Sequence, residues 1–508
     1  MPAPNSPDSE TAPDSSRRPV TFFHALLPIL VLLGLIVLGL IVPQTLDGME
    51  PIPLELVFIS AASFTVAMLF YLGFTWSEIE AAIDRKLKRA LPAFFILFSI
   101  GLLIGSWMVC GTIPMLVYYG LKLIDPTWIY LLAFLVPAVF SILTGTSWGS
   151  AGAVGIVIIG IAEAMGADLG ITAGAIIGGA VFGDKMSPLS DTTNLAALAA
   201  DVDLYDHIRS MLYTTVPSAA VAMSVYLVVG LLFPPEANAD NVALTQDFLS
   251  SLEGIFQFNV LLLLPPLVVL YSSIRQKPTL PTLIVASGLG VIFAIIFQRF
   301  TFSAIANSLI TGFSTDMASQ WHESVPQTVG DLLNRGGLYA LKDAVVIAFT
   351  VFIFIGAMDC INGIPRVVGE VFRFARTRPQ AILSALAATA VTNSLTSNQY
   401  ATSFIVGDAF KSKFDRLGIP RKVLSRSLED TGTMLETMVP WTPTAVFMIQ
   451  TLGVSYSEYW NWQLLSLCNF VVAPTLAITG IGCFYNESAN PNAESSSDDS
   501  AGVEEIPG

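Results

Sequence analysis

The sequence predicts an all-α polytopic membrane protein built from two inverted-topology repeats, each with a helical hairpin and a broken helix. Three observations lead to this fold. Of the 508 residues, 53% are hydrophobic and only 12% are charged, about half the charged fraction that is usual in a soluble protein. Apolar stretches of roughly 20 residues, the length that crosses a bilayer, recur from residue 22 to residue 485. Lysine and arginine concentrate in a few of the loops between them.

This composition excludes a soluble enzyme, and the net charge of −15 excludes a nucleic-acid binder, which would need a basic face. The polar tails, residues 1–20 and 486–508, are predicted to be disordered because they cannot bury apolar surface. We expect the first transmembrane repeat over residues 22–234 and the second, inverted repeat over residues 255–485. Four cysteines lie in or beside apolar segments, which predicts neither disulfides nor a metal site.

Hydropathy predicts an apolar element in each of these ranges: 22–43, 54–75, 91–119, 127–145, 147–166, 170–200, 208–234, 255–274, 279–298, 341–361, 379–395, 398–410, 428–454 and 458–485. The loops rich in lysine and arginine are 76–90, 274–278, 362–378 and 411–427, whereas 44–53 and 235–254 are acidic or neutral. Basic loops stay in the cytoplasm. Placing both termini in the cytoplasm puts every basic loop on that side.

Two segments predict helical hairpins that enter and leave on one side of the membrane. Residues 379–410 lie between two basic loops and have a polar centre, Thr392–Gln399. Residues 127–166, with the tip Thr144–Ser150, are the expected counterpart from the other side. Each half then has seven apolar elements, an odd number, so the second half would run inverted. Many secondary transporters have inverted repeats, with a site at the repeat interface.

Short internal similarities favour the same division of the chain. Leu143–Trp148 parallels Leu395–Tyr400, and Ser187–Thr192 parallels Arg426–Thr431. In each half, a hydroxyl-rich hairpin tip therefore precedes a polar span that contains Asp-Thr.

The richest polar stretch of the first half is Gly183–Asn194, with the sequence GDKMSPLSDTTN. Ionisable residues at bilayer depth are functional candidates because their burial is costly. Pro188 lacks an amide hydrogen, so in a continuous helix the carbonyl of Asp184 would lose its partner. Freed carbonyls, hydroxyls and carboxylates are the hard oxygen ligands that a small hard cation prefers.

The second half repeats this chemistry before the sequence VPWTP. By the same rule, Pro440 would free the carbonyl of Glu436. The polar residues here are Glu429, Asp430, Thr431, Thr433 and Glu436.

From the sequence alone, these residues can also have purely structural roles. Asp191 is also a suitable N-cap for a helix that restarts at Thr192. Asp184 and Lys185 can neutralise each other as a structural pair. Glu429 and Asp430 closely follow a basic loop and suit the start of a helix at the membrane interface.

Two enzyme-like readings are rejected. Gly145–Gly149 fits the nucleophile pattern G-x-S-x-G, but that pattern needs a strand-to-helix turn and a nearby base. Here it lies between two predicted membrane helices, and the three histidines fall elsewhere in the sequence. The sequence also contains no G-x-x-x-x-G-K-[ST] phosphate loop, so we expect no enzyme and no direct use of ATP.

Four long motifs resemble the NhaC-type Na⁺/H⁺ antiporter family. They are GTSWGSAGAVGIVIIGIAEAMG (145–166), GGAVFGDKMSPLSDTTNLAA (178–197), LTSNQYATSFIVGDAF (395–410) and LEDTGTMLETMVPWTPTA (428–445). The resemblance covers roughly residues 20–485. It implies inverted repeats with opposed hairpins, and exchange of cytoplasmic Na⁺ for external H⁺ across a bacterial inner membrane without a cofactor. Relatives with similar motifs exchange malate with Na⁺-lactate or move amino acids, so an organic-anion exchanger on the same fold is the alternative.

With this resemblance, the polar residues form an expected site. Asp184 and Asp191 would bind either Na⁺ or a proton, and Lys185 would tune the charge or, in an anion exchanger, bind the substrate carboxylate. The rest of the cation shell would be Thr146, Ser147, Ser190, Thr192 and Asn194. Asp430, Thr431 and Glu436 would form the pseudo-symmetric site or a proton relay. Expected partners are Na⁺, H⁺, the lipid bilayer and a second copy of the chain. A channel or a non-transporting sensor is a further alternative.

Overall fold

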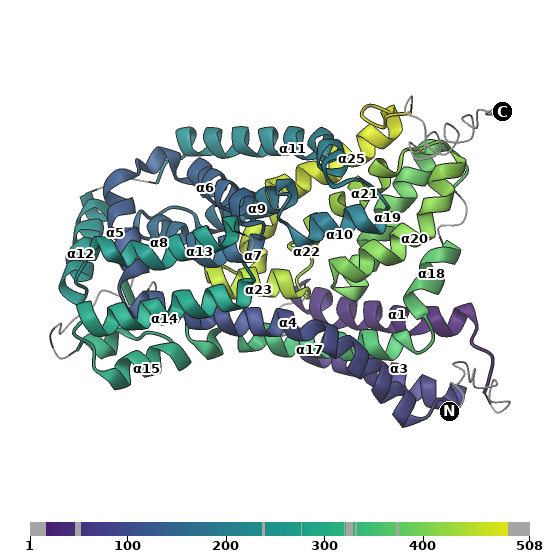
Figure 1. The fold of residues 1–508 in the computed structure, drawn as a ribbon, viewed down its shortest axis with the longest axis horizontal. Coiled ribbons are helices and arrows are strands. Elements are labelled where there is room, and N and C mark those ends of the chain that lie inside the picture. The colour runs from purple at the N-terminus through teal and green to yellow at the C-terminus, as the bar shows by residue number, and fades with distance from the viewer. Residues whose placement is uncertain are drawn as a thin grey trace, which may run out of the picture. The chain divides into compact units, whose positions relative to one another are not determined.

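A computed structural model describes residues 17–45, 52–235, 239–275, 277–319, 321, 329–330, 333–371 and 375–485. Throughout these residues the regular structure is helical, with no strand (Figure 1). The predicted all-α class is therefore confirmed. Residues 1–16 and 486–508, which hold most of the two tails that we expect to be disordered, lie outside the described residues.

Apolar helices dominate the described part of the chain. Seven of them are long and apolar enough to cross a membrane, and there are up to ten spans if each sharply bent helix pair counts as one. Large apolar side chains such as Ile284, Ile292 and Ile296 on one helix remain more than 45% exposed. A helix that is apolar all round and only partly covered by protein suits a lipid surrounding. The chain is a multi-pass membrane protein.

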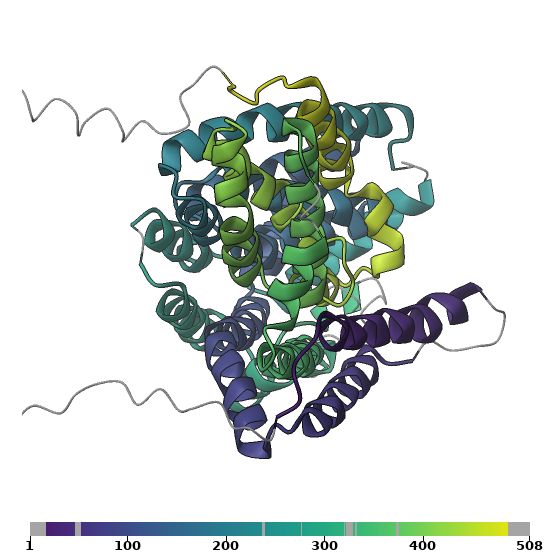
Figure 2. The ribbon, with the colours of Figure 1, turned by 90° about the vertical axis from the view of Figure 1, so that its right-hand side faces the viewer.

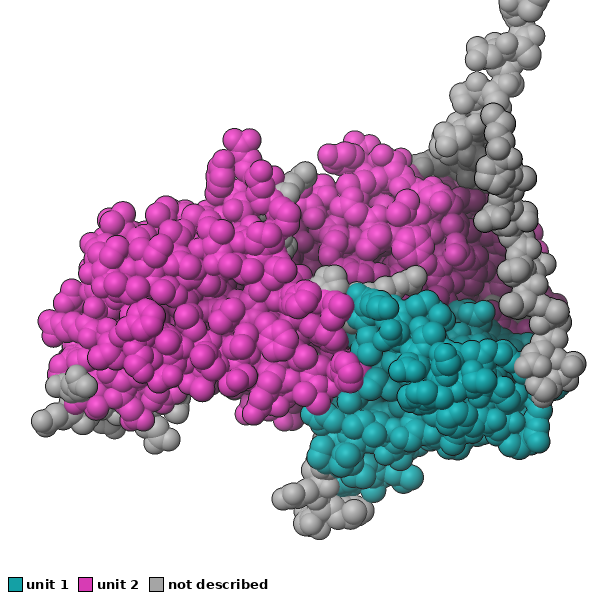
Figure 3. Space-filling model, turned by 60° about the horizontal axis from the view of Figure 1, so that its bottom comes forward, with its two compact units in different colours: residues 1–89, 350–367 teal, residues 90–349, 368–508 magenta. Residues whose placement is uncertain are grey.

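The chain divides into two compact units, which are described separately (Figure 3). Unit 1 comprises residues 1–89 and 350–367. In unit 1, α1 (Phe22–Ile36), the π turn η1 (Val37–Ile41) and α2 (Val42–Thr45) precede α3 (Leu54–Leu72), which packs against α1. Phe58 on α3 meets Phe354 edge to face, and Lys86 forms an ion pair with Asp359. Compactness thus groups the chain differently from the predicted repeats, whose boundaries stay a prediction.

Three helices in the described part of the chain run through the boundary of the units: α4 (Trp76–Val109), α17 (Lys342–Asp359) and α18 (Gly363–Val371). The first half of unit 2 contains α5 (Thr112–Leu123), η2 (Pro126–Trp128), α6 (Ile129–Thr144), α7 (Ser147–Ser150), the π turn η3 (Ala151–Gly155), α8 (Ile156–Ala164), α9 (Leu169–Met186), α10 (Asp191–Ala199) and α11 (Leu204–Leu232). Then follow α12 (Ala239–Ile255), η4 (Val260–Leu263), α13 (Leu264–Ile274), α14 (Thr279–Phe297), α15 (Phe302–Ile310), η5 (Thr315–Ala318) and η6 (Leu338–Leu341).

The C-terminal part contains α18 (Gly363–Val371), α19 (Arg378–Thr396), α20 (Gln399–Arg416), α21 (Arg421–Asp430), α22 (Thr433–Glu436), α23 (Pro443–Leu452), α24 (Tyr456–Tyr459), η7 (Trp460–Trp462) and α25 (Leu464–Thr479). Tight turns at Gly145–Thr146 and Ser397–Asn398 form the tips of the two predicted helical hairpins. Figure 2 shows α19 and α20, in green, side by side.

Several predicted loops are wrong, because charged residues also form helices. The basic segment 76–90 is the first part of α4, the segment 235–254 is largely α12, and 362–378 contains α18. The expected single span 91–119 is instead bent by 66° between α4 and α5. Hydropathy measures how a segment partitions into lipid, not whether its backbone is helical, so a helix that continues beyond the apolar stretch is missed.

Glycines bring α9 into direct backbone contact with its neighbours. A Cβ atom added at Gly179 would lie 2.0 Å from the carbonyl oxygen of Phe134 on α6, and one at Gly183 would lie 2.2 Å from that of Ala138. Glycines spaced by four residues form one face of a helix and let a membrane helix approach another closely. This contact fixes α9, and with it the polar residues at its end, against the first hairpin.

We expect Gly179→Ala to destabilise the protein, because the methyl group must push α9 away from the backbone of α6. Overpacking of this kind costs about 1–3 kcal/mol. The measurement is the thermal unfolding midpoint of the detergent-solubilised protein. Gly288→Ala on α14 is the matched control, since nothing lies within 4 Å of a Cβ atom added there. Equal midpoints for the two variants would contradict the role of the glycine face.

Candidate functional site

The predicted break of the polar helix is confirmed. α9 ends at Met186, and α10 begins at Asp191 with Ser190 as its N-cap, whose side chain accepts from the amide of Thr193. Pro188 lies between them, where its missing amide hydrogen disrupts no helical ladder. The expectation that the carbonyl of Asp184 is free is wrong: it accepts from the amide of Ser187 at 3.1 Å. The helix ends before the proline and therefore keeps this bond.

Asp184 lies on the last turn of α9 and is only 5% exposed. Its Oδ2 atom accepts from the amide of Ser147, 3.1 Å away, at the start of α7. The first amides of a helix have no partner within the helix, and they carry the positive end of its dipole. Among the described residues, Oδ1 of Asp184 has no hydrogen-bond partner, although the hydroxyls of Ser147 and Ser190 lie near the carboxylate.

Glu436 has the same relation to the second hairpin. It ends α22, and its Oε1 atom accepts from the amide of Gln399, 3.1 Å away, at the start of α20. Its Oε2 atom accepts from the hydroxyl of Thr444 at 2.8 Å. The carbonyl of Glu436 accepts from the hydroxyl of Thr442. The expectation that Pro440 leaves this carbonyl free is therefore also wrong.

In each half, a helix stops and a new helix starts around a proline, Pro188 or Pro440, and we call these two stretches the broken segments. The two carboxylates occupy equivalent positions in them. Asp184 and Glu436 each precede a proline by four residues and an N-cap hydroxyl residue, Ser190 or Thr442, by six. This pairing differs from the predicted parallel of Ser187–Thr192 with Arg426–Thr431. The Asp-Thr letters that suggested that parallel lie in a different local structure, since Asp430 ends α21 whereas Asp191 begins α10.

Contacts also run from each hairpin to the broken segment of the other half. Tyr400, on the first turn of α20, donates its phenol hydrogen to Oδ2 of Asp191. Trp148, on α7, donates its indole hydrogen to the hydroxyl of Thr444 over 3.3 Å. Both are the second residue of their helix, and sequence reasoning singled out neither as a site residue. The similarity of the tip motifs was the available signal.

Lys185 pairs with Asp430 and not with its neighbour Asp184, so the predicted Asp184–Lys185 pair is wrong. Lys185 is fully buried, and its Nζ atom lies 2.5 Å from Oδ1 of Asp430, which is 1% exposed. The same oxygen accepts from the hydroxyl of Thr214 on α11 at 2.8 Å. A buried ion pair needs such additional hydrogen bonds to offset the loss of hydration.

A buried arginine completes this cluster and corrects the sequence interpretation, which placed it in a cytoplasmic loop. Arg426 on α21 is 2% exposed, and its Nε atom lies 3.8 Å from Oδ2 of Asp430. It also donates to the carbonyls of Gly482 and Ser210, at 2.8 Å and 3.3 Å. Asp430 thus faces two cations inside unit 2.

Glu429 and Asp430 are buried at the end of α21, so the reading of them as interfacial residues at a helix start is wrong. Glu429 accepts from the hydroxyl of Thr433 at 2.6 Å, and its other oxygen has no partner among the described residues. Thr431 donates to the carbonyl of Leu386 on α19. Its hydroxyl hydrogen is therefore used to hold α19 to the broken segment.

The expected shell residues belong to the caps of the helices that start at the site. Thr146 is the N-cap of α7 and accepts from the amide of Gly149. Ser190 and Thr192 share a hydrogen bond of 3.0 Å. Asn194 donates to the carbonyls of Pro188 and Ser190, at 2.9 Å and 2.6 Å. The structure thus brings Ser147 into direct contact with Asp184 and places the other shell residues around the break. The N-cap of α10 is Ser190 and not Asp191.

Oxygen atoms without a hydrogen-bond partner gather in the same elements. Within the described residues, they include Oδ1 of Asp184, Oε1 of Glu429, Oε1 of Gln399 and the hydroxyls of Thr144 and Ser397. A buried polar atom without a partner is costly, and a ligand or water is the usual explanation. No group of three or more His, Cys, Asp or Glu side chains suited to a bound metal occurs in the described part.

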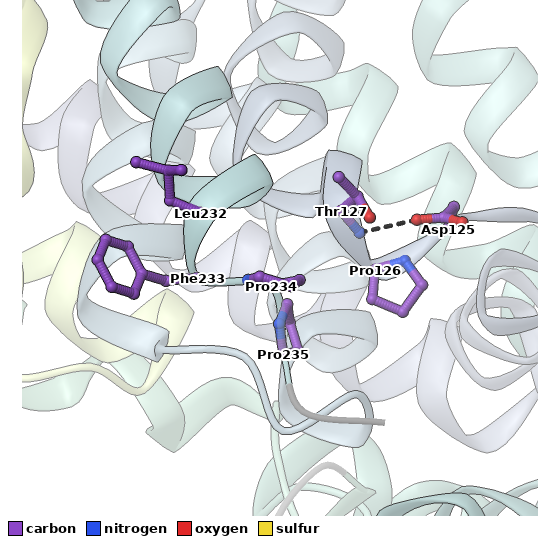
Figure 4. A pocket seen from close by; sticks show the side chains of 7 residues that line it. All are labelled: Asp125, Pro126, Thr127, Leu232, Phe233, Pro234 and Pro235. Atoms are coloured by element: carbon purple, nitrogen blue, oxygen red, sulfur yellow. Dashed lines mark hydrogen bonds between the residues drawn. The ribbon is translucent and has the colours of Figure 1, made fainter. Parts of the chain in front are cut away.

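A separate pocket of about 580 Å³ lies where η2 and the end of α11 meet (Figure 4). Prolines and apolar side chains line it, together with Asp125, whose carboxylate accepts from the amide of Thr127. None of the predicted site residues lines this pocket. The pocket therefore adds nothing to the polar cluster around the break of α9.

Comparison with known proteins gives extensive matches. The sequence profile of the Na⁺/H⁺ antiporter family matches residues 179–481. A protein of Haemophilus influenzae described as an uncharacterized Na⁺/H⁺ antiporter is 38% identical over 92% of this chain and 97% of its own length. The Na⁺/H⁺ antiporter NhaC of Alkalihalophilus pseudofirmus is 34% identical over 90% of this chain and 96% of its own. The malate-2H⁺/Na⁺-lactate antiporter of Bacillus subtilis is 32% identical over 92% and 98%.

The family profile covers both broken segments and the second hairpin, and the three relatives each match 90–92% of this chain. They confirm the resemblance of the four motifs to this family. The chain belongs to the Na⁺/H⁺ antiporter family.

Proposed function

We propose that the protein is a secondary transporter that exchanges cytoplasmic Na⁺ for external H⁺ across a bacterial inner membrane, with both termini in the cytoplasm. The observation that carries the proposal is Asp184. It is a buried carboxylate that one helix start holds by one oxygen while the other oxygen has no partner among the described residues. Family membership supports the exchanged ions, and the basic loops support the orientation.

Competition for one carboxylate explains the exchange. A bound Na⁺ favours the charged carboxylate, whereas a proton neutralises it in a surrounding that has little water. Asp184 can therefore hold either ion but not both. Ser147 and Ser190 provide further oxygen atoms for the cation, and Asp191 adds a second negative charge that acts on Asp184. Thr146, Thr192 and Asn194 hold the helix starts that bring these groups together.

Glu436 provides the second proton-binding group in this proposal, because it repeats the relation of Asp184 to a hairpin tip. In this proposal, Asp430 has a charge-balancing role in place of the ion-binding or relay role expected from the sequence. It already faces Lys185 and Arg426, so it balances buried positive charge and need not bind transported ions. Each ion drives the conformational cycle only by binding one state better than the other.

The alternative is a Na⁺- or H⁺-coupled exchanger of organic anions such as malate and lactate, which the Bacillus subtilis relative favours. Such a substrate needs a cation for its carboxylate, and Lys185 is the expected one. In the structure, Lys185 is paired with Asp430, and Arg426 donates to two carbonyls. An organic anion would have to displace these contacts, which makes the inorganic cation the better-supported substrate.

We expect Asp184→Asn to reduce Na⁺-driven proton movement by about tenfold or more, because an amide provides neither the charge for Na⁺ nor the site for the proton. The assay uses purified protein in liposomes that contain a pH dye and a preset proton gradient. Asp168→Asn is the matched control: it makes the same change at the other, exposed end of α9, where asparagine also caps a helix.

Full exchange by Asp184→Asn would overturn the assignment of the site. In the same liposomes, K⁺ is added in place of Na⁺, and malate or lactate is then added together with Na⁺. Collapse of the gradient only when an organic acid is present would replace the cation–proton exchanger with the organic-anion exchanger. Flux that simply follows one ion's own gradient would indicate a channel.

Competition also makes a quantitative prediction about pH. Each proton bound at Asp184 excludes one Na⁺, so the Na⁺ concentration for half-maximal exchange should rise as pH falls, by up to about tenfold per pH unit. The measurement is the Na⁺ dependence of initial rates at a series of pH values, equal on both sides of the membrane. A half-maximal Na⁺ concentration that does not change with pH would show that the two ions bind at separate groups.

A further inference from the structure

Two hairpin tips connect three carboxylates through one continuous series of contacts. The series begins at Asp184, which accepts from the amide of Ser147. The next residue in the chain, Trp148, donates to the hydroxyl of Thr444. Thr444 donates to Glu436. Glu436 also accepts from the amide of Gln399, and the next residue, Tyr400, donates to Asp191.

Trp148 restricts the hydrogen bonds that Thr444 can make with Glu436. An indole N–H only donates, so the Thr444 hydroxyl accepts from it at one of its two lone pairs. The hydroxyl sends its single hydrogen to Oε2 of Glu436, its one acceptor among the described residues. Both oxygens of Glu436 thereby accept. A carboxylate satisfies this arrangement, whereas a protonated acid needs an acceptor for its own hydrogen.

We propose that Trp148 is a positioning residue that couples proton binding at Glu436 to ion binding at Asp184. This inference rests on the proposed cation–proton exchange. When Glu436 donates a proton towards Thr444, the hydroxyl hydrogen of Thr444 loses its only acceptor among the described residues. Turning that hydrogen towards Trp148 displaces the indole. Trp148 directly follows Ser147 on α7, so that movement also displaces the amide that holds Asp184.

Packing favours a concerted movement of Trp148 and the tip. Its ring stacks on Phe447 of α23, with ring centroids 4.9 Å apart and an angle of 16° between the planes. Phe447 itself is fully buried. The indole is therefore held between the first hairpin and the segment that follows Glu436, and it cannot reorient independently of either.

Tyr400 has the corresponding place on the second hairpin, with one difference. A phenol oxygen both donates and accepts, so its bond to Asp191 can reverse when Asp191 is protonated. Trp148 cannot reverse its bond. The coupling is therefore asymmetric: the indole favours the carboxylate form of Glu436, whereas the phenol accommodates either form of Asp191.

The test is Trp148→Phe, which removes the N–H group and keeps an aromatic ring against Phe447. Two fluxes are compared in the same liposomes: exchange of radioactive Na⁺ for unlabelled Na⁺, and Na⁺-driven proton movement. We expect Na⁺–Na⁺ exchange to stay within about twofold of the unsubstituted protein while proton movement per Na⁺ falls by about half, since the proton of Asp184 still exchanges for Na⁺ and that of Glu436 no longer does. Thr444→Val removes the same link from the other side and should have the same effect, without a further loss in the double variant.

Trp107→Phe is the control for ring size, because Trp107 is buried in unit 2 and its indole nitrogen has no partner among the described residues. A parallel fall of both fluxes in Trp148→Phe and Thr444→Val would mean a merely structural role and would overturn the inference. Unchanged coupling in both variants would also overturn it. Absence of Na⁺-driven proton movement in the unsubstituted protein would instead overturn the proposed function, and the inference with it.

Discussion

The helices α7 and α20 both start at a hairpin tip within unit 2, and the first backbone amide of each needs an acceptor. The amides of Ser147 and Gln399 find one in the carboxylates of Asp184 and Glu436. Without these acceptors, both hairpin tips would bury unpaired donors, which costs more than the bond itself contributes. Conversely, without the two amides, the buried carboxylates would lose the backbone donors that stabilise their charge. The breaks after α9 and α22, the proline residues and the polar tips all follow from this mutual requirement.

Much of this arrangement was predictable because its signals are local. Proline at a polar stretch predicts a broken helix, and a polar centre between two basic loops predicts a hairpin; both are confirmed at Pro188 and at Ser397–Asn398. Asp184 and Glu436 were identified because ionisable residues are rare in apolar sequence. The exchange of contacts between Trp148, Tyr400 and the opposite broken segments was not predictable, since it depends on how elements distant in sequence pack.

The buried cations show why charge in a loop is an ambiguous signal. Arg426 follows five other basic residues in the segment 411–427, yet it is buried against Asp430. Lys185 precedes the break by two residues and also pairs with Asp430. Counting basic residues orients a helix but does not reveal which of them turns inward. In the second broken segment, Thr437 occupies the place of Lys185 and Pro443 that of Asp191, so the charges of the two segments differ although their caps agree.

The π turn η3 lets the first hairpin accommodate a difference in chain length. Ala151–Gly155 separates the tip, which carries Trp148, from the span α8. A π turn holds one residue more than an α-helical turn, and each residue of an α-helix turns the chain by about 100°. The wider turn absorbs the extra residue, so loss of one residue here would restore a regular helix and leave α8 in nearly the same rotation against the tip. Loss of one residue within α8 would instead rotate the rest of that helix by about that angle. A change of chain length at Ala151–Gly155 therefore preserves both the face that α8 buries and the direction of the indole, whereas the same change elsewhere in the hairpin would rearrange one or the other.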